Sequence, residues 1–374
     1  MSGTAAASVP RLRPAAEALL PSSVPVQLVT EAGRASPAPS DYPEPPAEQL
    51  RETYRQMVVG RRFDQQASAL ARQGRLAVYP SSRGQEACQI AGVLALREQD
   101  WLFPTYRDTV AMVARGVDPV EALTLLRGDW HCGFDPVVAR VAPPCTPLAT
   151  QLLHATGMAD ALRRKDENGV VMAFVGDGGT SEGDFHEALN FAAVFRAPVV
   201  FLIQNNQYAI SVPLDRQTAS PALAYKGVGH GMRSEQVDGN DPVATLSVLT
   251  AAVEHARSGR GPFLVEAHTY RVDGHTNADD PRRYRTDDEV RRRSAADPVP
   301  RLETYLRDRG VLTDQDVDAV RAEAEERAAA LRTRMAAESP LDPLELFEHV
   351  YAEPTPQLLE QRDQLAAELK GTES

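Results

Sequence analysis

Two short apolar runs, separated by a segment of helix length, constrain the fold of this chain most strongly. VVMAFV occupies residues 170–175 and VVFLI occupies residues 199–203. Between them, apolar side chains recur at helical spacing over residues 185–195, with Ser181 expected to cap the helix and Pro198 to end it. Runs that are apolar at every position are typical of parallel strands buried on both faces. The pattern predicts a right-handed strand–helix–strand unit.

The remaining chain extends this unit into a larger domain. Helical spacing occurs over residues 46–73, 84–97, 109–115, 148–164 and 242–258, and a third apolar run covers 263–272. We therefore expect an α/β domain over residues 46–300, with a doubly wound, mostly parallel sheet flanked by helices. Residues 1–45 are rich in proline and are expected to form a flexible N-terminal extension. Residues 301–374 are expected to form a helical C-terminal segment, with a charged, solvated helix followed by a docking segment.

Charge and cysteine usage exclude several classes of protein. The net charge is -12 and no basic stripe is visible, so we expect no nucleic-acid partner. No apolar run approaches the roughly 18 residues that span a membrane, so no membrane association is expected. The chain has three cysteines, Cys88, Cys132 and Cys145, whose spacing matches no zinc or redox motif. They are expected to be free thiols, which favours a cytoplasmic protein.

Polar motifs follow both apolar runs of the central unit. Asp177 lies in GDGG after the first run, and Asn206 lies in QNNQYAIS after the second, 29 positions later. The carboxyl ends of parallel strands meet at one edge of a sheet, where ligands bind. Glycine-rich turns that lead into helices hold phosphate, and Mg²⁺ prefers carboxylate, amide and carbonyl oxygens. The two motifs therefore predict a phosphate that is bridged to the protein by a metal ion.

The stretch GDGGTSEGDFHEALNFAAVFRAPVVFLIQNNQYAIS resembles a known family. It is similar to the thiamine-diphosphate signature in the α subunit of the decarboxylating first component of 2-oxoacid dehydrogenase complexes. The resemblance covers about residues 50–350. It implies the thiamine-diphosphate-binding fold, with Mg²⁺ held by Asp177, Asn206 and the backbone carbonyl of Tyr208. It also implies that Gly178 lies against the cofactor.

Three further segments carry the same resemblance. In FPTYRDT, Tyr106 and Arg107 stand where the family contacts the cofactor diphosphate, and arginine suits phosphate oxygens geometrically. In CTPLATQ, Thr146 and Leu148 stand at positions that line the cofactor. The polar stretch YRVDGHTNADDPRRYR resembles the mobile active-site loop, in which His275 is implied to contact the cofactor and to act in catalysis.

Some positions depart from the family pattern. Related enzymes bind a structural potassium ion through positions that match Cys145, Pro147, Thr150 and Gln151. Cys145 stands where an oxygen-bearing serine is common, which argues against the potassium ion. Gln204 stands where some relatives place an arginine against the cofactor. Thr276 replaces the regulatory phosphoserine of mammalian relatives, so phosphorylation control is not expected.

The resemblance implies a reaction and its substrate class. A 2-oxo acid is oxidatively decarboxylated, and its acyl group passes to a lipoyl group on the second component, an acyltransferase. PLATQ and VDGND resemble the branched-chain type, so 3-methyl-2-oxobutanoate is the favoured substrate. Pyruvate remains an alternative, because GDGGTS and QNNQYAIS also occur in pyruvate-type relatives of some bacteria, and acetoin cleavage is a further one.

Proteins of a different functional class can also contain this central unit. A non-catalytic or regulatory protein on the same fold, or a magnesium-dependent phosphate enzyme without thiamine, would share the central unit. A phosphate-transfer enzyme does not need the other three segments together, and a degenerate binding protein would be expected to lose Asp177 or Asn206. The chain is too short to hold both halves of a thiamine site. The resemblance implies that a β subunit supplies the other half, in a heterotetramer of two α and two β chains.

Overall fold

The computed structural model describes residues 15–37, 40–129, 131–337 and 342–372. The expected N-terminal extension and C-terminal segment therefore lie partly outside the described residues.

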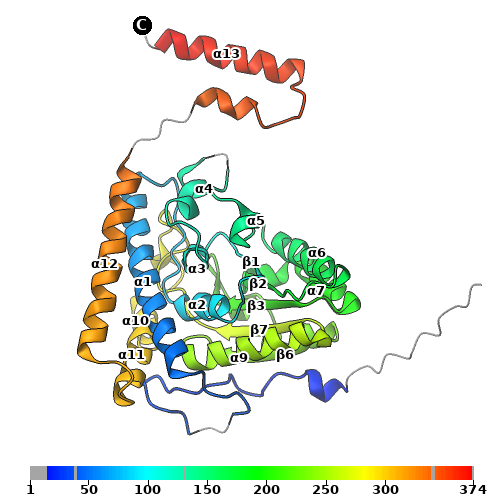
Figure 1. Cartoon of the computed structure of the whole chain (residues 1–374), viewed down its shortest axis with the longest axis vertical. Helices are drawn as coiled ribbons and strands as arrows, with labels where there is room; N and C mark the ends of the chain where they lie inside the picture. The colour runs from blue at the N-terminus through cyan, green and yellow to red at the C-terminus, as the bar shows by residue number, and fades with distance from the viewer. Residues whose placement is uncertain (1–14, 38–39, 130, 338–341, 373–374) are drawn as a thin grey trace, which may run out of the picture.

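A parallel sheet of five strands lies at the centre of the described chain, in the order β1-β2-β3-β7-β6 (Figure 1). Its strands are β1 (Trp101–Phe103), β2 (Val171–Gly176), β3 (Val199–Asn205), β6 (Arg233–Asp238) and β7 (Phe263–His268). A small antiparallel hairpin of β4 (Tyr208–Ala209) and β5 (Val212–Pro213) follows β3 directly. The register places Val171 beside Val199, so β2 and β3 end at the same edge of the sheet. The expected α/β architecture is confirmed.

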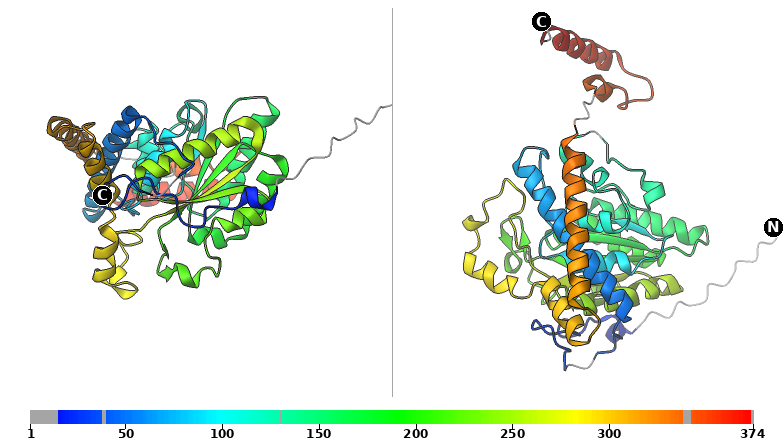
Figure 2. Two further views of the ribbon diagram at one scale, coloured as in Figure 1. Left: turned by 90° about the horizontal axis from the view of Figure 1, so that it is seen from below. Right: turned by 60° about the vertical axis from the view of Figure 1, so that its left-hand side comes forward.

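Helices cover both faces of the sheet (Figures 1 and 2). Along β2, Val171 and Ala173 pack with α6 and α7, whereas Met172 and Phe174 pack with α2 and α9. This alternation explains why the strands are apolar at nearly every position. The helices are α1 (Ala47–Arg72), α2 (Glu86–Leu94), α3 (Thr109–Ala114), α4 (Thr124–Arg127), α5 (Pro136–Ala139), α6 (Thr150–Arg164), α7 (Gly183–Phe195), α8 (Tyr225–Gly229), α9 (Pro242–His255), α10 (Asp287–Ser294), α11 (Pro298–Asp308), α12 (Asp314–Ala336) and α13 (Pro356–Thr372).

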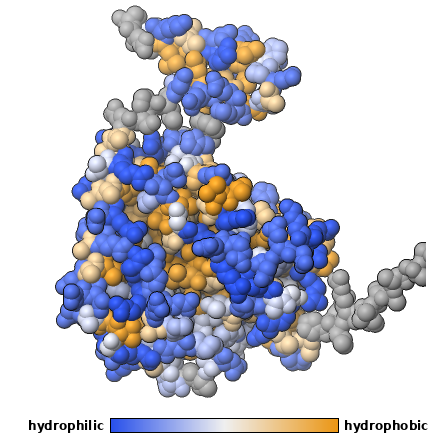
Figure 3. Space-filling model, in the orientation of Figure 1, coloured by the Kyte–Doolittle hydropathy of each residue, from blue (hydrophilic) through white to orange (hydrophobic). Residues whose placement is uncertain are grey.

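The C-terminal helices differ in how they contact the domain. The charged helix α12 is not simply solvated, because Leu331 and Met335 are buried against α1, which runs beside it (Figure 2). By contrast, α13 packs on the 3₁₀ turn Pro343–Phe347 and stands apart from the sheet in both figures. Apolar side chains are exposed on this last segment, as Figure 3 shows in orange.

The segment that precedes α1 differs from the flexible extension that we expected through residue 45. Val26 forms a parallel bridge with Val237 on β6, donating its N–H to the Gln236 carbonyl at 2.9 Å. The backbone N–H groups of Leu28 and Val29 both donate to the carboxylate of Asp241, at 2.7 and 2.6 Å. The described part of this segment has little regular structure, but side chains and a sheet edge far along the sequence hold it in place.

Candidate active site at the carboxyl ends of β2 and β3

Asp177 and Asn206 meet at the carboxyl ends of β2 and β3. Gly176 and Gln204 pair across the two strands, so the next turns of both strands leave the sheet side by side. The backbone N–H of Asn206 donates to Oδ1 of Asp177 at 3.3 Å. The structure thus brings together the two side chains that the sequence predicts as metal ligands.

Asp177 is almost fully buried, and its environment is unfavourable for an isolated charge. Burial raises the pKa of the Asp177 carboxyl above its usual range. Hydrogen bonds from Gln217, at 2.7 Å to Oδ2, and from the Asn206 backbone oppose this rise, as does the charge of Arg271. A buried carboxylate with so few fixed cations close by is a fitting ligand for a divalent ion.

The turn after β3 presents the third predicted ligand. Gln207 precedes β4 and Ile210 lies in the turn between β4 and β5. Both residues have positive φ angles, 76° and 57°, which let the backbone turn back on itself. The carbonyl of Tyr208 accepts a hydrogen bond from Nη1 of Arg271 at 3.2 Å. A carbonyl oxygen has a second lone pair, so this contact leaves Tyr208 able to bind a metal ion.

Gly178 opens the 3₁₀ turn Gly178–Ser181 that follows Asp177. A Cβ at this position would lie 2.7 Å from the Cβ of Ala209 in β4. Only glycine therefore allows the turn to close against the hairpin, which brings Asp177 close to Asn206. The turn also changes the helix start that we expected, because α7 begins at Gly183 and Ser181 does not cap it.

Arg107 and His275 lie together on the wall of the site. Arg107 is buried and donates from Nη1 to the Ser81 carbonyl at 3.1 Å and from Nη2 to Nδ1 of His275 at 3.0 Å. Arginine cannot accept a hydrogen bond, so the neutral His275 ring carries its proton on Nε2. Burial, and then the charges of Arg107 and Arg271, lower the pKa of His275 to about 4. Tyr106 lies edge-on to the His275 ring, with 6.0 Å between ring centroids.

These residues line a cavity of about 240 Å³. The predicted site residues on its wall are Tyr106, Arg107, Leu148, Asp177, Gly178, Asn206, Tyr208 and His275. Thr146 is not among the lining residues, although Cys145 and Leu148 on either side of it are. Arg107 and Arg271 line the same cavity as Asp177, and this combination of charges suits an anionic group joined to the carboxylate by a metal ion.

Arg271 is a site residue that our sequence reasoning missed. Its side chain is 1% exposed, and it donates to the carbonyls of Tyr208 and Ile210. Its Nε is buried and has no hydrogen-bond partner among the described residues. The signal was present, because Arg271 follows the buried strand β7 closely, as Asp177 follows β2.

The positions that match a potassium site are engaged in other contacts. The thiol of Cys145 donates to the Pro147 carbonyl at 3.1 Å, and the hydroxyl of Thr150 donates to Asp184 at 3.0 Å. Gln151 donates to the Phe174 carbonyl at 2.8 Å, which leaves its buried Oε1 without a partner. One unpaired amide oxygen does not make an ion site, so we carry no potassium ion into the proposed function.

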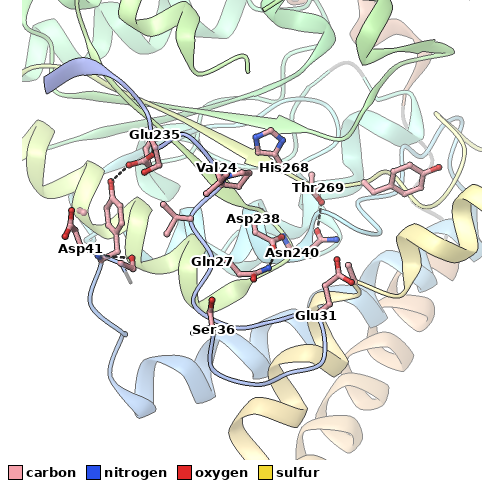
Figure 4. A pocket seen from close by; sticks show the side chains of 18 of the residues that line it. Val24, Gln27, Glu31, Ser36, Asp41, Glu235, Asp238, Asn240, His268 and Thr269 are labelled. Carbon is pink, nitrogen blue, oxygen red and sulfur yellow. Dashed lines mark hydrogen bonds between the residues drawn. The ribbon is translucent and has the colours of Figure 1, made fainter. Parts of the chain in front are cut away.

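A second hollow, of about 1550 Å³, lies between the segment before α1 and strands β6 and β7 (Figure 4). Its polar side chains bind one another: Gln27 donates to Asp238 at 3.0 Å, and Thr269 donates to Asn240 at 2.7 Å. None of the predicted site residues lines it. We therefore place the candidate active site in the smaller of the two cavities.

The metal-binding potential of the described residues is limited to mixed ligands. They contain no group of three or more His, Cys, Asp or Glu side chains arranged to hold a metal ion. A metal ion at Asp177 would therefore depend on amide and carbonyl oxygens as well.

Within the residues that the structure describes, no helix has the length and apolar character needed to cross a membrane.

Comparison with known proteins identifies the family. The dehydrogenase E1 component family matches residues 54–341. This chain belongs to that family. A relative in Mycobacterium tuberculosis, the 3-methyl-2-oxobutanoate dehydrogenase subunit alpha, is 47% identical over 349 residues, which cover 93% of this chain and 95% of the relative. A pyruvate dehydrogenase E1 component subunit alpha from Staphylococcus aureus is 40% identical over 285 residues, or 75% and 77% of the two chains.

Membership of the E1 family confirms several expectations at a general level. The chain is similar to α subunits of 2-oxoacid dehydrogenases, which are thiamine-diphosphate-dependent oxidoreductases. An E1 α subunit implies a β subunit and a larger complex. Family membership does not assign a role to any single residue, so the role of each site residue stays a prediction.

Proposed function

We propose that this chain is the α subunit of an enzyme that decarboxylates a branched-chain 2-oxo acid and transfers the acyl group to a lipoyl group, with thiamine diphosphate and Mg²⁺. The observation that carries the proposal is the single cavity that Asp177, Asn206, Arg107 and Arg271 line together. The name of the Mycobacterium tuberculosis relative supports 3-methyl-2-oxobutanoate as the substrate.

The protein would hold the cofactor by its diphosphate. Bound thiamine diphosphate supplies the nucleophilic carbon and the electron sink that decarboxylation of a 2-oxo acid requires. Asp177, the amide oxygen of Asn206 and the carbonyl of Tyr208 would hold Mg²⁺, which neutralises the diphosphate and ties it to the sheet. Arg107 and Arg271 add two buried positive charges to the lining of the cavity.

His275 would act on the substrate through Nε2. Its Nδ1 is bound by Arg107, which orients the ring and leaves the proton at Nε2. Because the lowered pKa keeps the ring neutral at pH 7, Nε2–H can donate to negative charge that develops on the substrate oxygen. The same proton can assist acyl transfer to the lipoyl group.

The remaining half of the site would come from a β subunit. We propose that it contributes the glutamate that binds the aminopyrimidine ring, in a heterotetramer of two α and two β chains. The exposed side chains of Leu148 and Ile210 line the cavity and suit such a contact. The lipoyl-bearing acyltransferase would then dock at the completed site. The three cysteines are free, which suits the cytoplasm as the proposed location.

Pyruvate is the second candidate substrate. The Staphylococcus aureus relative favours it, since its pyruvate dehydrogenase name accompanies 40% identity. Discrimination between the two substrates depends on a few methyl groups in a pocket that both subunits would line. A non-catalytic role is not favoured, because Asp177, Asn206 and His275 are all retained.

The proposed function is tested with the α chain copurified with its β partner. Decarboxylation is followed with an artificial electron acceptor, using 3-methyl-2-oxobutanoate and pyruvate, with and without thiamine diphosphate and Mg²⁺. We expect cofactor-dependent turnover that is faster with 3-methyl-2-oxobutanoate, that is lost in Asp177→Ala and that is kept in Asp215→Ala, an exposed acid outside the cavity. Faster turnover of pyruvate would reassign the substrate, and a complex that binds no thiamine diphosphate would overturn the proposal.

A further inference from the structure

We propose that Gln85 and Gln204 are positioning residues that determine which end of the Asn206 side-chain amide faces the metal ion. The inference rests on the magnesium site of the proposed function. Two buried amides, those of Gln204 and Gln85, link Asp108 to Asn206 through successive hydrogen bonds, and each of the four residues is at most 6% exposed. An amide has a donor end and an acceptor end, so one fixed end of such a chain orients every member.

The fixed end of the chain is the carboxylate of Asp108. Its Oδ2 accepts from the backbone N–H of Thr105 at 2.7 Å and from the Thr105 hydroxyl at 2.6 Å. Its Oδ1 accepts from Nε2 of Gln89 at 2.9 Å and from Nε2 of Gln204 at 2.7 Å. Asp108 is fully buried, so all four of these contacts are with protein groups.

Gln89 establishes that Oδ1 of Asp108 is an acceptor. Oε1 of Gln89 accepts from the backbone N–H of Ala111 at 3.2 Å, and Nε2 donates to the carbonyl of Arg107 at 3.2 Å. Backbone N–H groups can only donate and carbonyls can only accept, so the Gln89 amide has one possible orientation. Its nitrogen therefore faces Asp108, and Oδ1 carries no proton toward it.

The orientation then passes to Asn206. Nε2 of Gln204 donates to Oδ1 of Asp108 at 2.7 Å, so its Oε1 is left to accept from Nε2 of Gln85 at 3.0 Å. Oε1 of Gln85 accepts in turn from Nδ2 of Asn206 at 2.9 Å. The oxygen of Asn206 is thereby the atom left for the metal ion.

The far end of the chain agrees independently. The backbone N–H of Tyr208 donates to Oδ1 of Asn206 at 3.3 Å, and this donor also requires an oxygen at that place. The Asn206 amide is therefore oriented from both ends by groups whose hydrogen-bonding role is fixed. With Gln85 and Gln204 replaced by apolar side chains, Nδ2 would lose its buried acceptor, and the amide could turn its N–H groups toward the cation.

The test measures magnesium binding to the α–β complex after chelation of its metal. Half-saturation by Mg²⁺ is determined by calorimetry with thiamine diphosphate present, together with the thermal midpoint of the cofactor-free complex. We expect Gln85→Leu to weaken Mg²⁺ binding by about 10–100-fold, the usual effect of losing a partner that orients a ligand, and Gln204→Leu to weaken it less. Gln85→Glu keeps an acceptor for Nδ2 of Asn206 in either protonation state, so it is expected to bind Mg²⁺ nearly as wild type does.

Gln89→Leu is the matched control. It loses an equally buried hydrogen bond to Asp108 but does not lie on the path to Asn206, so its thermal midpoint should fall while Mg²⁺ binding stays close to wild type. Equal weakening of Mg²⁺ binding in the three leucine variants, or weakening in none, would overturn the inference, as would loss of binding in Gln85→Glu. Wild-type complex that fails to bind thiamine diphosphate with Mg²⁺ would instead overturn the proposed function, and the inference with it.

Discussion

Arg107 donates a hydrogen bond from Nη2 to Nδ1 of His275 over 3.0 Å, and this contact sets the tautomer of the histidine. A guanidinium group has no acceptor, so the ring proton lies on Nε2. Burial lowers the pKa of His275 to about 4, and Arg107 and Arg271 contribute to this shift. The residue proposed to act on the substrate is thus a neutral donor over the physiological pH range.

Replacement of Arg107 by methionine should shift the pH dependence of the enzyme. Without the neighbouring charge, the pKa of His275 rises above about 4, while burial and Arg271 still hold it below its ordinary value. Activity measured at saturating cofactor should then begin to fall at a higher pH in Arg107→Met than in wild type as the solution is made acidic. Arg83→Met is the control, since Arg83 pairs with Asp273 at 3.6 Å and not with His275. An unchanged acidic limb in Arg107→Met would contradict this account.

Replacement of His275 by alanine should separate catalysis from cofactor binding. We expect kcat to fall by about 10²–10⁴-fold, the usual contribution of a positioned proton donor. Affinity for thiamine diphosphate, measured by calorimetry, should change far less, because Asp177 and Asn206 would still hold its metal ion. A parallel loss of both quantities would mean that His275 mainly binds the cofactor.

Asp64 should make the stability of the chain decrease as pH rises. The carboxyl is fully buried in α1, and burial raises its pKa from 3.8 to about 6. Between these values the folded chain keeps a proton that the unfolded chain releases, so the free energy of unfolding falls by about 2 kcal/mol from pH 4 to pH 6. Its partner Ser81 has one hydroxyl proton, but Oγ of Ser81 lies 2.7 Å from Oδ2 of Asp64 and 2.9 Å from Oδ2 of Asp273. The hydroxyl therefore cannot donate to both carboxylates at once. A protonated Asp64 can donate to Ser81, which frees that proton for Asp273.

The Asp64→Asn variant should behave as the permanently protonated form. Its amide nitrogen can donate to Ser81 at any pH, and its oxygen can still accept from Tyr79. We therefore expect the variant complex to melt at a higher temperature than wild type at pH 7, with the difference shrinking at pH 5. Equal melting temperatures at both pH values would show that Asp64 does not titrate in this range.

Alanine at position 178 should disturb the site through packing alone. The added Cβ would meet the Ala209 Cβ at 2.7 Å, so the 3₁₀ turn or the β4–β5 hairpin must move. We expect a loss of about 1–3 kcal/mol in stability and weaker binding of thiamine diphosphate. Gly183→Ala is the matched control, because its Cβ would meet no atom within 4 Å. Similar affinities in the two variants would show that the turn adapts freely.

The C-terminal segment is expected to serve assembly. Leu346, Val350 and Tyr351 are each at least half exposed, an unusual arrangement for three apolar side chains so close in sequence. A chain that ends at residue 337 should fold, as judged by circular dichroism, but should associate more weakly with the β subunit in sedimentation experiments. Unimpaired assembly of the shortened chain would remove the docking role that we expect for this segment.

Sequence patterns predicted the central unit well because local rules act there. Asp177 and Asn206 each follow a strand that is apolar on both faces, and parallel strands end at one edge whatever the rest of the chain does. Arg271 obeys the same rule after β7, but the sequence pattern placed it inside an apolar run that was expected to extend to residue 272, whereas β7 ends at His268. The sequence did not indicate that Gln85 belongs to the site. Its partner Gln204 lies on β3, more than 100 positions away along the chain.

The failed expectations share a physical cause. The helix cap at Ser181 is displaced because the glycines after Asp177 permit a 3₁₀ turn, and α7 starts one residue later than a cap at Ser181 requires. The segment around Val26 has no local preference for order, and it is held by β6 and Asp241. The charged pattern of α12 gave no sign that apolar residues such as Leu331 and Met335 lie against α1. Each outcome depends on contacts between distant parts of the chain.

The bridges at Val26 and Val141 have a consequence for the chain before it meets a partner. Val26 pairs with Val237 on the outer strand β6, and Val141 pairs with Leu102 on the opposite outer strand β1. Each bridge occupies backbone groups that would otherwise be open to strands of other molecules, a common route to aggregation. Each bridge therefore covers part of an outer edge of the sheet, and removal of the residues before α1 would leave that part of β6 open to edge-to-edge pairing.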